Sequence, residues 1–348
     1  MKNVFVGLSG GVDSATSAYL LKKAGYAVTG VFLKVWEPDF LPCTGPQDRL
    51  DAMRVAAHLE IPFKTYDLEA EYKKGVVDYF IDEYRAGRTP NPDVMCNREI
   101  KFGAFWKQAQ KDGADAIATG HYAVNKDIGD AHALMRSPDN TKDQSYFLWT
   151  LTQNDLAHAL FPIGHLKKPE VRRIAEEAGL PNFDRKDSQG LCFLGHVDME
   201  EFLKHYILVT RGVARTRDGT EVAEHDGASF YTIGQRFHVP GKEKLYVVAK
   251  DLEKNELVLS ETLEVPERAR TVVHLARTNW IRREPAHGTL YDVQIRYHGE
   301  RHKAKIQVNS VQFEEPVLVA PGQSLVVYDP ETGECMGGGI MTGNANNR

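Results

Sequence analysis

The feature that most constrains this chain is a glycine-rich turn at residues 7–14, with the sequence Gly-Leu-Ser-Gly-Gly-Val-Asp-Ser. The turn lies between an apolar run at 4–7 and a helical pattern at 15–24. A strand that ends in glycines and opens a helix presents backbone N–H groups and the positive end of the helix dipole to an anion. Gly10 and Gly11 let the chain take positive φ and let a phosphate approach the backbone. The segment therefore predicts a phosphate-binding turn.

Asp13 separates this turn from the commoner phosphate loops. The Walker loop needs a lysine directly after its glycines, and the dinucleotide fingerprint needs Gly-x-Gly-x-x-Gly; neither pattern is present. Ser9 and Ser14 add hydroxyl donors, whereas Asp13 is an acid where a phosphate is expected. We expect Asp13 to act through Mg²⁺ or to hold the loop's own amides. The plainer alternative is a solvated Gly/Ser turn.

The pattern Ser-Gly-Gly-x-Asp-Ser resembles the loop of the pyrophosphatase-loop family of ATP enzymes. The resemblance implies cleavage of ATP between the α and β phosphates, transfer of the adenylate to a carbonyl-type oxygen and release of pyrophosphate. The loop alone does not name the substrate.

Length and composition fit two or three ordinary globular domains, because 348 residues with 42% hydrophobic and 26% charged residues can bury several cores. The sequence has no apolar run of membrane-spanning length and no basic-then-apolar leader, so we expect a cytoplasmic protein with no membrane partner. The four cysteines are Cys43, Cys96, Cys192 and Cys335. They show no Cys-x-x-Cys spacing, so any cysteine chemistry must come from pairs that folding brings together.

The pattern of the chain changes near residue 205. Before it, β-branched runs at 4–7, 28–33, 63–68 and 116–119 alternate with helical patterns such as 49–59 and 75–85. This alternation predicts an α/β domain at 1–205, a doubly wound parallel sheet that binds ligands at the carboxyl ends of its strands. Later strands are expected at 229–233, 245–250, 256–259, 291–297, 303–308 and 323–328. They predict a small β-rich module at 206–266 and a C-terminal β-barrel or sandwich at 267–348.

Basic residues gather in one stretch although the chain as a whole has a net charge of −5. Residues 268–305 hold nine Lys or Arg residues against three acidic residues. Such a stretch is typical of a surface that follows a phosphate backbone. The alternative is a solvated strand surface on which alternate positions are basic.

Two segments place a thiol in a context that favours reactivity. In 91–102, Asp93 lies three residues before Cys96, and if Asn97 or its neighbour caps the following helix, the dipole lowers the pKa of the Cys96 thiol. Asp93 would then accept a proton. In 184–195, Arg185 and Lys186 precede Cys192 and make its loop electropositive. Ordinary core packing is the alternative for both thiols. A third polar segment, 137–148, predicts a turn that enters an apolar helix.

These segments occur in a fixed order: Ser-Gly-Gly-Val-Asp-Ser at 9–14, Asn-Pro-Asp-x-x-Cys-Asn at 91–97, Gly-His-Tyr at 120–122, Lys-Asp-Gln-Ser-Tyr at 142–146 and Ser-Gln-x-x-Cys-Phe at 188–193. On these motifs the chain resembles the tRNA-specific 2-thiouridylase family. The resemblance extends to 225–227, 231–236 and 337–340. It implies ATP-dependent 2-thiolation of the wobble uridine of tRNA, with AMP and pyrophosphate released. Sulfur would arrive as a cysteine persulfide from a sulfur-relay donor protein or a cysteine desulfurase.

The resemblance also implies a role for each matched residue, with ATP and Mg²⁺ as cofactors. ATP would be held by Gly7, Leu8, Ser9, Gly10, Gly11, Val12, Asp13, Ser14, Leu33 and Gly120. The target base would face Asn91, Pro92 and Asp93, and the other tRNA contacts would be His121, Lys142, Asp143, Gln144, Arg296, Tyr297 and Gln323. Cys192 would carry the persulfide and Cys96 would attack it, leaving a disulfide between them.

The sequence departs from the family pattern at two places. Leu33 stands where the family often has methionine, a swap that conserves volume. Phe237 and His238 replace the usual Lys-Gly, which puts a charged contact at that turn in doubt. Two other functions stay open: a pyrophosphatase-loop synthetase acting on a small-molecule carbonyl, and a tRNA-binding protein that uses ATP only as a conformational ligand. The sequence leaves open whether sulfur leaves as hydrosulfide or the persulfide attacks directly.

Overall fold

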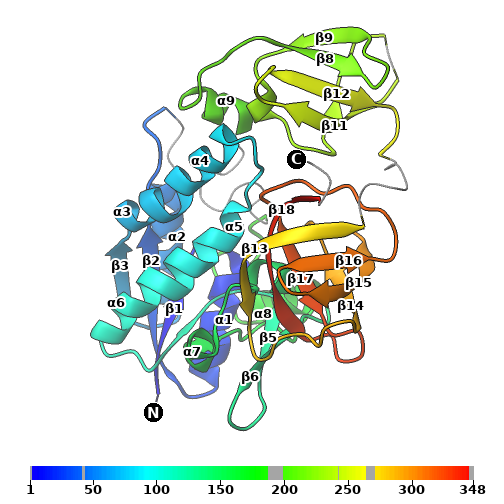
Figure 1. The fold of residues 1–348 in the computed structure, drawn as a ribbon. Coiled ribbons are helices and arrows are strands. Elements are labelled where there is room, and N and C mark those ends of the chain that lie inside the picture. The colour runs from blue at the N-terminus through cyan, green and yellow to red at the C-terminus, as the bar shows by residue number, and fades with distance from the viewer. Residues whose placement is uncertain (1, 41–43, 187–198, 242, 264–270, 345–348) are drawn as a thin grey trace.

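A five-stranded parallel sheet forms the centre of the N-terminal part of the chain (Figure 1). The computed structural model describes residues 2–40, 44–186, 199–241, 243–263 and 271–344. The strands of the sheet, in the spatial order β3-β2-β1-β4-β7, are β3 (Phe63–Asp67), β2 (Ala27–Lys34), β1 (Asn3–Gly7), β4 (Ala116–Ala118) and β7 (Ala159–Leu160). The parallel sheet predicted from the sequence is confirmed. The two-residue strand β7 is too short to leave a pattern in the sequence.

Helices cover both faces of this sheet, as alternation along β1 requires. Val4 and Val6 point into a core shared with α1 (Val12–Lys23), α2 (Gly45–His58) and α8 (Lys168–Glu177). Phe5 points the other way, into a core shared with a second helical layer. That layer consists of α3 (Glu69–Tyr72), η1 (Lys73–Asp78), α4 (Tyr79–Arg85), α5 (Pro92–Met95), η2 (Cys96–Ala104) and α6 (Phe105–Lys111). The sheet is therefore doubly wound.

The strand order creates a switch point between β1 and β4. The chain runs outward from β1 through β2 to β3 and then crosses to β4 on the other side of β1. Open α/β sheets bind ligands at such a point, outside the carboxyl ends of the strands. The glycine-rich loop follows β1 here, and Gly120 follows β4.

Smaller elements connect the sheet to the rest of the chain. They are the hairpin β5 (Ala123–Asp127) and β6 (His132–Arg136), η3 (Ser145–Leu148), α7 (Gln153–His158) and α9 (Met199–Lys204). The segment 145–148 is a short 3₁₀ turn, so the longer apolar helix predicted there is wrong. Its side chains are nonetheless buried, because Tyr146 and Leu148 pack into the main core.

The central module is a five-stranded sheet with its own apolar core. Its strands, in the order β10-β11-β12-β8-β9, are β10 (Arg236–Phe237), β11 (Leu245–Asp251), β12 (Glu256–Ser260), β8 (Gly212–Thr216) and β9 (Glu221–His225). The strand predicted at 229–233 is wrong, because η4 (Ala228–Phe230) forms a 3₁₀ turn there. Gly227 precedes this turn with a φ of +145°, a conformation that interrupts an extended run and favours glycine.

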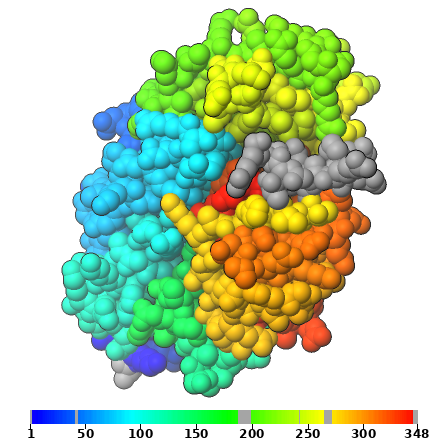
Figure 2. All heavy atoms as spheres, viewed as in Figure 1, coloured from blue at the N-terminus to red at the C-terminus, as the bar shows by residue number. Residues whose placement is uncertain are grey.

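Six strands close into a barrel at the C-terminal end. Of the two predicted architectures, the barrel is confirmed and the sandwich is wrong. The strands, in barrel order, are β13 (Val272–Trp280), β16 (Ser310–Phe313), β15 (Arg301–Gln307), β14 (Leu290–Gln294), β17 (Ser324–Tyr328) and β18 (Cys335–Asn344). Figure 2 shows the barrel packed against the side of the N-terminal part, with the central module above both. Asn279 joins the first two, since its Nδ2 donates to the backbone oxygens of Trp149 and Leu151 at 2.8 and 2.9 Å.

Candidate active site

The glycine-rich loop joins the end of β1 to the first turn of α1. Gly10 has a φ of +77°, which a residue with a side chain adopts only under strain. Gly11 is the N-cap of α1 and supplies no side-chain acceptor to the N–H groups of the first turn. Ser14 Oγ donates to the Gly11 oxygen at 3.1 Å and accepts from Ser9 N at 3.3 Å. This is the geometry of an anion-binding turn that its own serines hold in shape.

Buried residues of the loop itself and a glycine from a neighbouring strand end hold the loop in place. Leu8 and Val12 are buried in the core, while Gly7 ends the strand. A Cβ atom at Gly120 would lie 2.8 Å from the backbone carbon of Asp13 and 2.8 Å from Ser14 N, so only glycine fits at this approach. Leu33, near the end of β2, is half-buried against the main core. Gly120 and the loop therefore share one site.

Asp13 is held by two side chains that sequence reasoning missed. Tyr122 Oη donates to one Asp13 carboxylate oxygen at 2.8 Å. Lys168 Nζ donates to both carboxylate oxygens, at 2.8 and 2.9 Å. These residues lie 109 and 155 positions from Asp13 along the chain, so no local pattern marks them. The expectation that Asp13 holds the loop's own amides does not match these partners.

On its other side, the loop is held through the carbonyl oxygen of Gly10. Asn182 Nδ2 donates to this oxygen at 2.7 Å, and Arg185 Nη1 donates to it at 3.2 Å. Arg185 also pairs with Asp51 at 3.0 Å and with Asp48. The sequence predicts that the charge of Arg185 lies beside Cys192. In the structure, Arg185 lies at the glycine-rich loop, and the carboxylates of Asp48 and Asp51 neutralise its charge.

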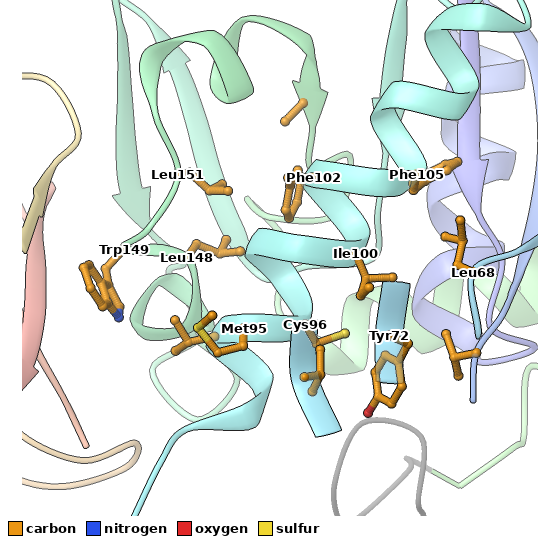
Figure 3. Close-up of a cluster of buried hydrophobic side chains, with 14 of the residues drawn as sticks. Leu68, Tyr72, Met95, Cys96, Ile100, Phe102, Phe105, Leu148, Trp149 and Leu151 are labelled. Atoms are coloured by element: carbon orange, nitrogen blue, oxygen red, sulfur yellow. The ribbon is translucent and has the colours of Figure 1, made fainter. Parts of the chain in front are cut away.

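Cys96 lies one helical turn inside its helix, and this corrects the predicted cap. Asn91 is the N-cap of α5, with Pro92 at the first helical position and Val94 N donating to Asn91 Oδ1 at 3.4 Å. Asn97 is already inside the continuing helix, so the expected contact of Cys96 with the helix N-terminus is wrong. Cys96 has no exposed surface. Figure 3 shows it in the buried cluster that contains Tyr72 and Ile100.

A series of hydrogen bonds links the loop to the Cys96 helix. Tyr122, whose hydroxyl binds Asp13, receives Gln144 N on its backbone oxygen at 2.8 Å and donates its own N–H to Gln144 Oε1 at 2.9 Å. Three residues later, the Phe147 oxygen accepts from Asn97 Nδ2 at 3.0 Å. Asn97 directly follows Cys96, and its buried Oδ1 has no hydrogen-bond partner among the residues that the structure describes. One polar path thus joins Asp13 to the residue beside the thiol.

Several residues expected to contact tRNA have structural partners instead of an open surface. His121 is buried, its Nδ1 lies 2.7 Å from Thr119 Oγ1, and burial followed by the charge of Lys101 holds the pKa of His121 well below its usual value. Asp143 is buried and accepts from Arg136 Nε at 2.7 Å. His121 and Asp143 therefore expose little surface, and their contact with tRNA stays a prediction. Lys142 is half-buried.

The three parts of the molecule meet at Thr89, just before Asn91. Gln323 Nε2, from the barrel, donates to the backbone oxygens of Thr89 and Pro90 at 3.0 and 3.1 Å. Thr89 Oγ1 donates to Thr232 Oγ1 of the central module at 3.0 Å. A pocket of about 260 Å³ opens beside this junction, and its walls are Thr232, Ile233, Gly234, Gln235, Ile295, Arg296, Leu318, Ala320 and Gln323. Asn91, Pro92 and Asp93 are half-buried next to it in sequence.

The basic stretch contributes only part of its charge to this pocket. Arg282 pairs with Glu334 at 2.8 Å and Lys303 pairs with Asp292 at 2.7 Å, while Arg268 and Arg270 lie outside the described residues. Arg296 is exposed, and no carboxylate of the described ranges lies within 4.0 Å of its guanidinium.

The adjacent Tyr297 packs on Phe147 with ring centroids 4.3 Å apart. Burial, the largest cause, and the charges of nearby carboxylates raise the pKa of Tyr297 to about 12. Tyr297 thus joins the pocket side of the barrel to the segment that binds Asn97.

Of the other three cysteines, the structure describes Cys335. Cys192 and Cys43 lie outside the described residues. Cys335 is fully buried at the start of β18, and burial raises the pKa of its thiol. Cys335 therefore packs as an ordinary residue of the main core.

Three family models match successive parts of the chain. They are described as tRNA methyl transferase HUP domain, at residues 2–196, tRNA methyl transferase PRC-barrel domain, at 200–261, and aminomethyltransferase beta-barrel domain, at 270–341. A protein of Lacticaseibacillus paracasei named tRNA-specific 2-thiouridylase MnmA is 44% identical over 97% of this chain and 93% of its own. The Escherichia coli K12 protein of the same name is 44% identical over 98% of this chain and 96% of its own. The chain belongs to the tRNA-specific 2-thiouridylase family.

Beyond the 2-thiouridylase family, the chain shares a weak likeness with a solved structure titled as a 4-thiouridine synthetase–RNA complex with bound ATP. The TM-score is 0.35 at 19% identity, over 59% of this chain and 50% of that chain. A likeness of this size adds nothing about function.

No helix within the described ranges is long and apolar enough to cross a membrane. Within the same ranges, no three or more His, Cys, Asp or Glu side chains are grouped so as to hold a metal ion.

Proposed function

We propose that this protein catalyses ATP-dependent 2-thiolation of the wobble uridine of tRNA. The observation that carries the proposal is the hydrogen-bonded path from Asp13 through Tyr122 and Gln144 to Asn97, beside Cys96. It joins an anion-binding turn to a thiol-bearing helix within one domain. An enzyme that activates an oxygen with ATP and replaces it with sulfur needs both groups near one substrate.

In the first step, ATP would bind at the loop with its phosphates on the first-turn amides of α1. The uridine C2 oxygen attacks the α phosphate, pyrophosphate leaves, and the oxygen becomes part of an AMP leaving group. Asp13 is the carboxylate that would hold a Mg²⁺ ion, which commonly takes one or two carboxylates together with substrate phosphates. To do so, Asp13 would release part of its contact with Lys168, which donates to both of its oxygens. Mg²⁺ would supply charge neutralisation to the leaving pyrophosphate.

In the second step, Cys192 would carry a persulfide delivered by a sulfur-relay donor protein or a cysteine desulfurase. The Cys96 thiolate attacks the Cys192 sulfur that is bound to the terminal sulfur, which leaves as hydrosulfide. Hydrosulfide attacks C2 of the adenylated uridine, and AMP departs. Two cysteines are oxidised to a disulfide while the terminal sulfur is reduced, so a reductant must reopen the disulfide. Asp93, three residues before Cys96, would accept the proton of the Cys96 thiol.

The pocket at the Thr89 junction would receive the RNA around the target base. Arg296 supplies an exposed cation there, and Gln323 fixes the backbone that leads into Asn91, Pro92 and Asp93. Lys142 and Gln144 lie on the segment next to Asn97 and would complete the contact surface. The buried His121 and Asp143 would support this surface from below.

Pyrophosphate release tests this function against its alternatives. We expect release to require unmodified tRNA and to persist in Cys96→Ser and Cys192→Ser variants, which lack only the sulfur step. Release without tRNA would favour a small-molecule synthetase. ATP binding with no release would favour a tRNA-binding protein.

A further inference from the structure

Lys168 brings a positive charge to the glycine-rich loop from a distant part of the chain. Its Nζ donates to both carboxylate oxygens of Asp13, at 2.8 and 2.9 Å, and its side chain is only 10% exposed. Asp13 is in the first turn of α1, where the backbone N–H groups and the helix dipole favour an anion. The ammonium therefore lies beside the same turn that would hold the phosphates of ATP.

Several contacts fix the position of Lys168. Its backbone N–H donates to Asp139 Oδ2 at 2.9 Å, and Pro169 follows it in the first turn of α8. Its ammonium lies 5.9 Å from the ring centroid of Tyr122, whose hydroxyl also donates to Asp13. α8 packs against α1 in one apolar core, so the helix that carries Lys168 is held against the helix that follows the loop. A long side chain held in this way loses little further entropy on binding a ligand.

The charge balance of the loop gives this arrangement a purpose. The loop has no lysine of its own after the glycines, as a Walker loop would. It carries an acid instead, and a lone Asp13 carboxylate would repel a triphosphate on the same turn. Pairing with the Lys168 ammonium cancels that charge.

We propose that Lys168 is a phosphate-binding residue of the ATP site, sharing its ammonium between Asp13 and the bound phosphates. Lys168 would bind phosphate as the lysine of a Walker loop does, but it comes from α8 and not from the loop itself. The inference rests on the proposed ATP-dependent function and adds to it a residue that no loop motif contains.

Direct binding to ATP and to adenosine tests the inference. Lys168→Met removes the charge and keeps much of the stem, and the neighbouring exposed Lys167→Met is the matched control. We expect Lys168→Met to bind ATP about ten- to a hundredfold more weakly in titration calorimetry, the size of a lost charge-assisted contact. Adenosine, which has no phosphates, should bind Lys168→Met and wild type equally. Lys167→Met should bind both ligands as wild type does.

Three results would overturn the assignment. ATP affinity unchanged in Lys168→Met would remove Lys168 from the site. An equal loss of ATP and adenosine affinity would show a structural role only. Full recovery of ATP affinity in the Asp13→Asn/Lys168→Met double variant would show that Lys168 only neutralises Asp13. Failure of the wild type to bind ATP would instead contradict the proposed function, and this outcome is distinct from the other three.

Discussion

Cys96 shows at the scale of one residue how position decides reactivity. The thiol has no exposed surface, and it lies one turn inside its helix rather than at the positive end of the dipole. Thiolates exchange only with sulfur that can reach them. For the proposed chemistry, the surroundings of Cys96 must open when substrates bind.

We predict that iodoacetamide modifies Cys96 slowly in the free protein and at least tenfold faster in the presence of tRNA and a non-hydrolysable ATP analogue. Burial protects the thiol until the site opens. Peptide mass spectrometry after timed quenching measures the modification at each cysteine. Cys335, also fully buried, is the internal control and should stay protected throughout. Rapid modification of Cys96 in the free protein would contradict the account.

His121 makes a prediction about pH. Burial, aided by the Lys101 charge, keeps the pKa of His121 well below the usual 6.5, so the folded protein holds the ring neutral. The unfolded chain binds a proton below about pH 6.5, and the folded chain does not. The free energy of unfolding should therefore fall as pH drops below 6.5. Above pH 6.5, His121 should not contribute to the pH dependence of this free energy. Urea denaturation of wild type and His121→Gln at pH 5.5 and 7.5 measures this: the variant should lose less stability between the two values. An equal loss would exclude His121 as a cause.

At the scale of elements, the irregular segment before α5 depends on the barrel. Gln323 donates two hydrogen bonds to the backbone oxygens of Thr89 and Pro90, and Thr89 N donates to the Pro321 oxygen at 2.8 Å. The helix that carries Asn91 and Cys96 thus begins from a support that lies more than 230 residues away in sequence.

We predict that Gln323→Ala lowers the free energy of unfolding by about 1–3 kcal/mol, because it leaves two carbonyl oxygens without their donor. It should also weaken tRNA binding, since the Asn91 segment loses its support. Gln307→Ala is the control, as this exposed glutamine bonds to Gln312 and Ser310 within the barrel and not to the segment before α5. Denaturant titration and a filter-binding assay measure the two effects. Equal stability of the two variants would show that the junction does not hold the segment.

Some elements were predictable because their signals are local. The loop at 7–14 lies between a strand and a helix that are adjacent in sequence, and the structure has both. The Asn-Pro pair at 91–92 is also typical of a helix start, yet the cap was expected at Asn97 or its neighbour. The strand expected at 229–233 failed because Gly227 breaks the extended path. Lys168 and Tyr122 were missed since only the fold brings them to Asp13.

At the scale of the whole molecule, the charge is distributed unevenly. The chain carries a net charge of −5, and part of its basic stretch is neutralised by Glu334 and Asp292. Arg296 keeps an exposed guanidinium beside the pocket where three parts of the molecule meet. The expected contribution to RNA binding is therefore focused on a few residues rather than spread along the stretch.

We predict that tRNA binding weakens steeply with salt and that Arg296→Ala reduces the slope of log affinity against log salt by about 1, the effect of one lost phosphate contact. Arg211→Ala should leave the slope unchanged, because Arg211 pairs with Glu224 on the central module. Fluorescence anisotropy at several salt concentrations gives both slopes. A slope that Arg296→Ala does not change would remove this residue from the RNA contact.

The most direct test of the central claim is mass spectrometry of nucleosides from unmodified tRNA after incubation with the protein, ATP, Mg²⁺ and a desulfurase sulfur source. We predict 2-thiouridine only when ATP is present and only with Cys96 and Cys192 intact. The Cys192→Ser variant should yield none. Full thiolation by Cys192→Ser, or thiolation without ATP, would contradict the account.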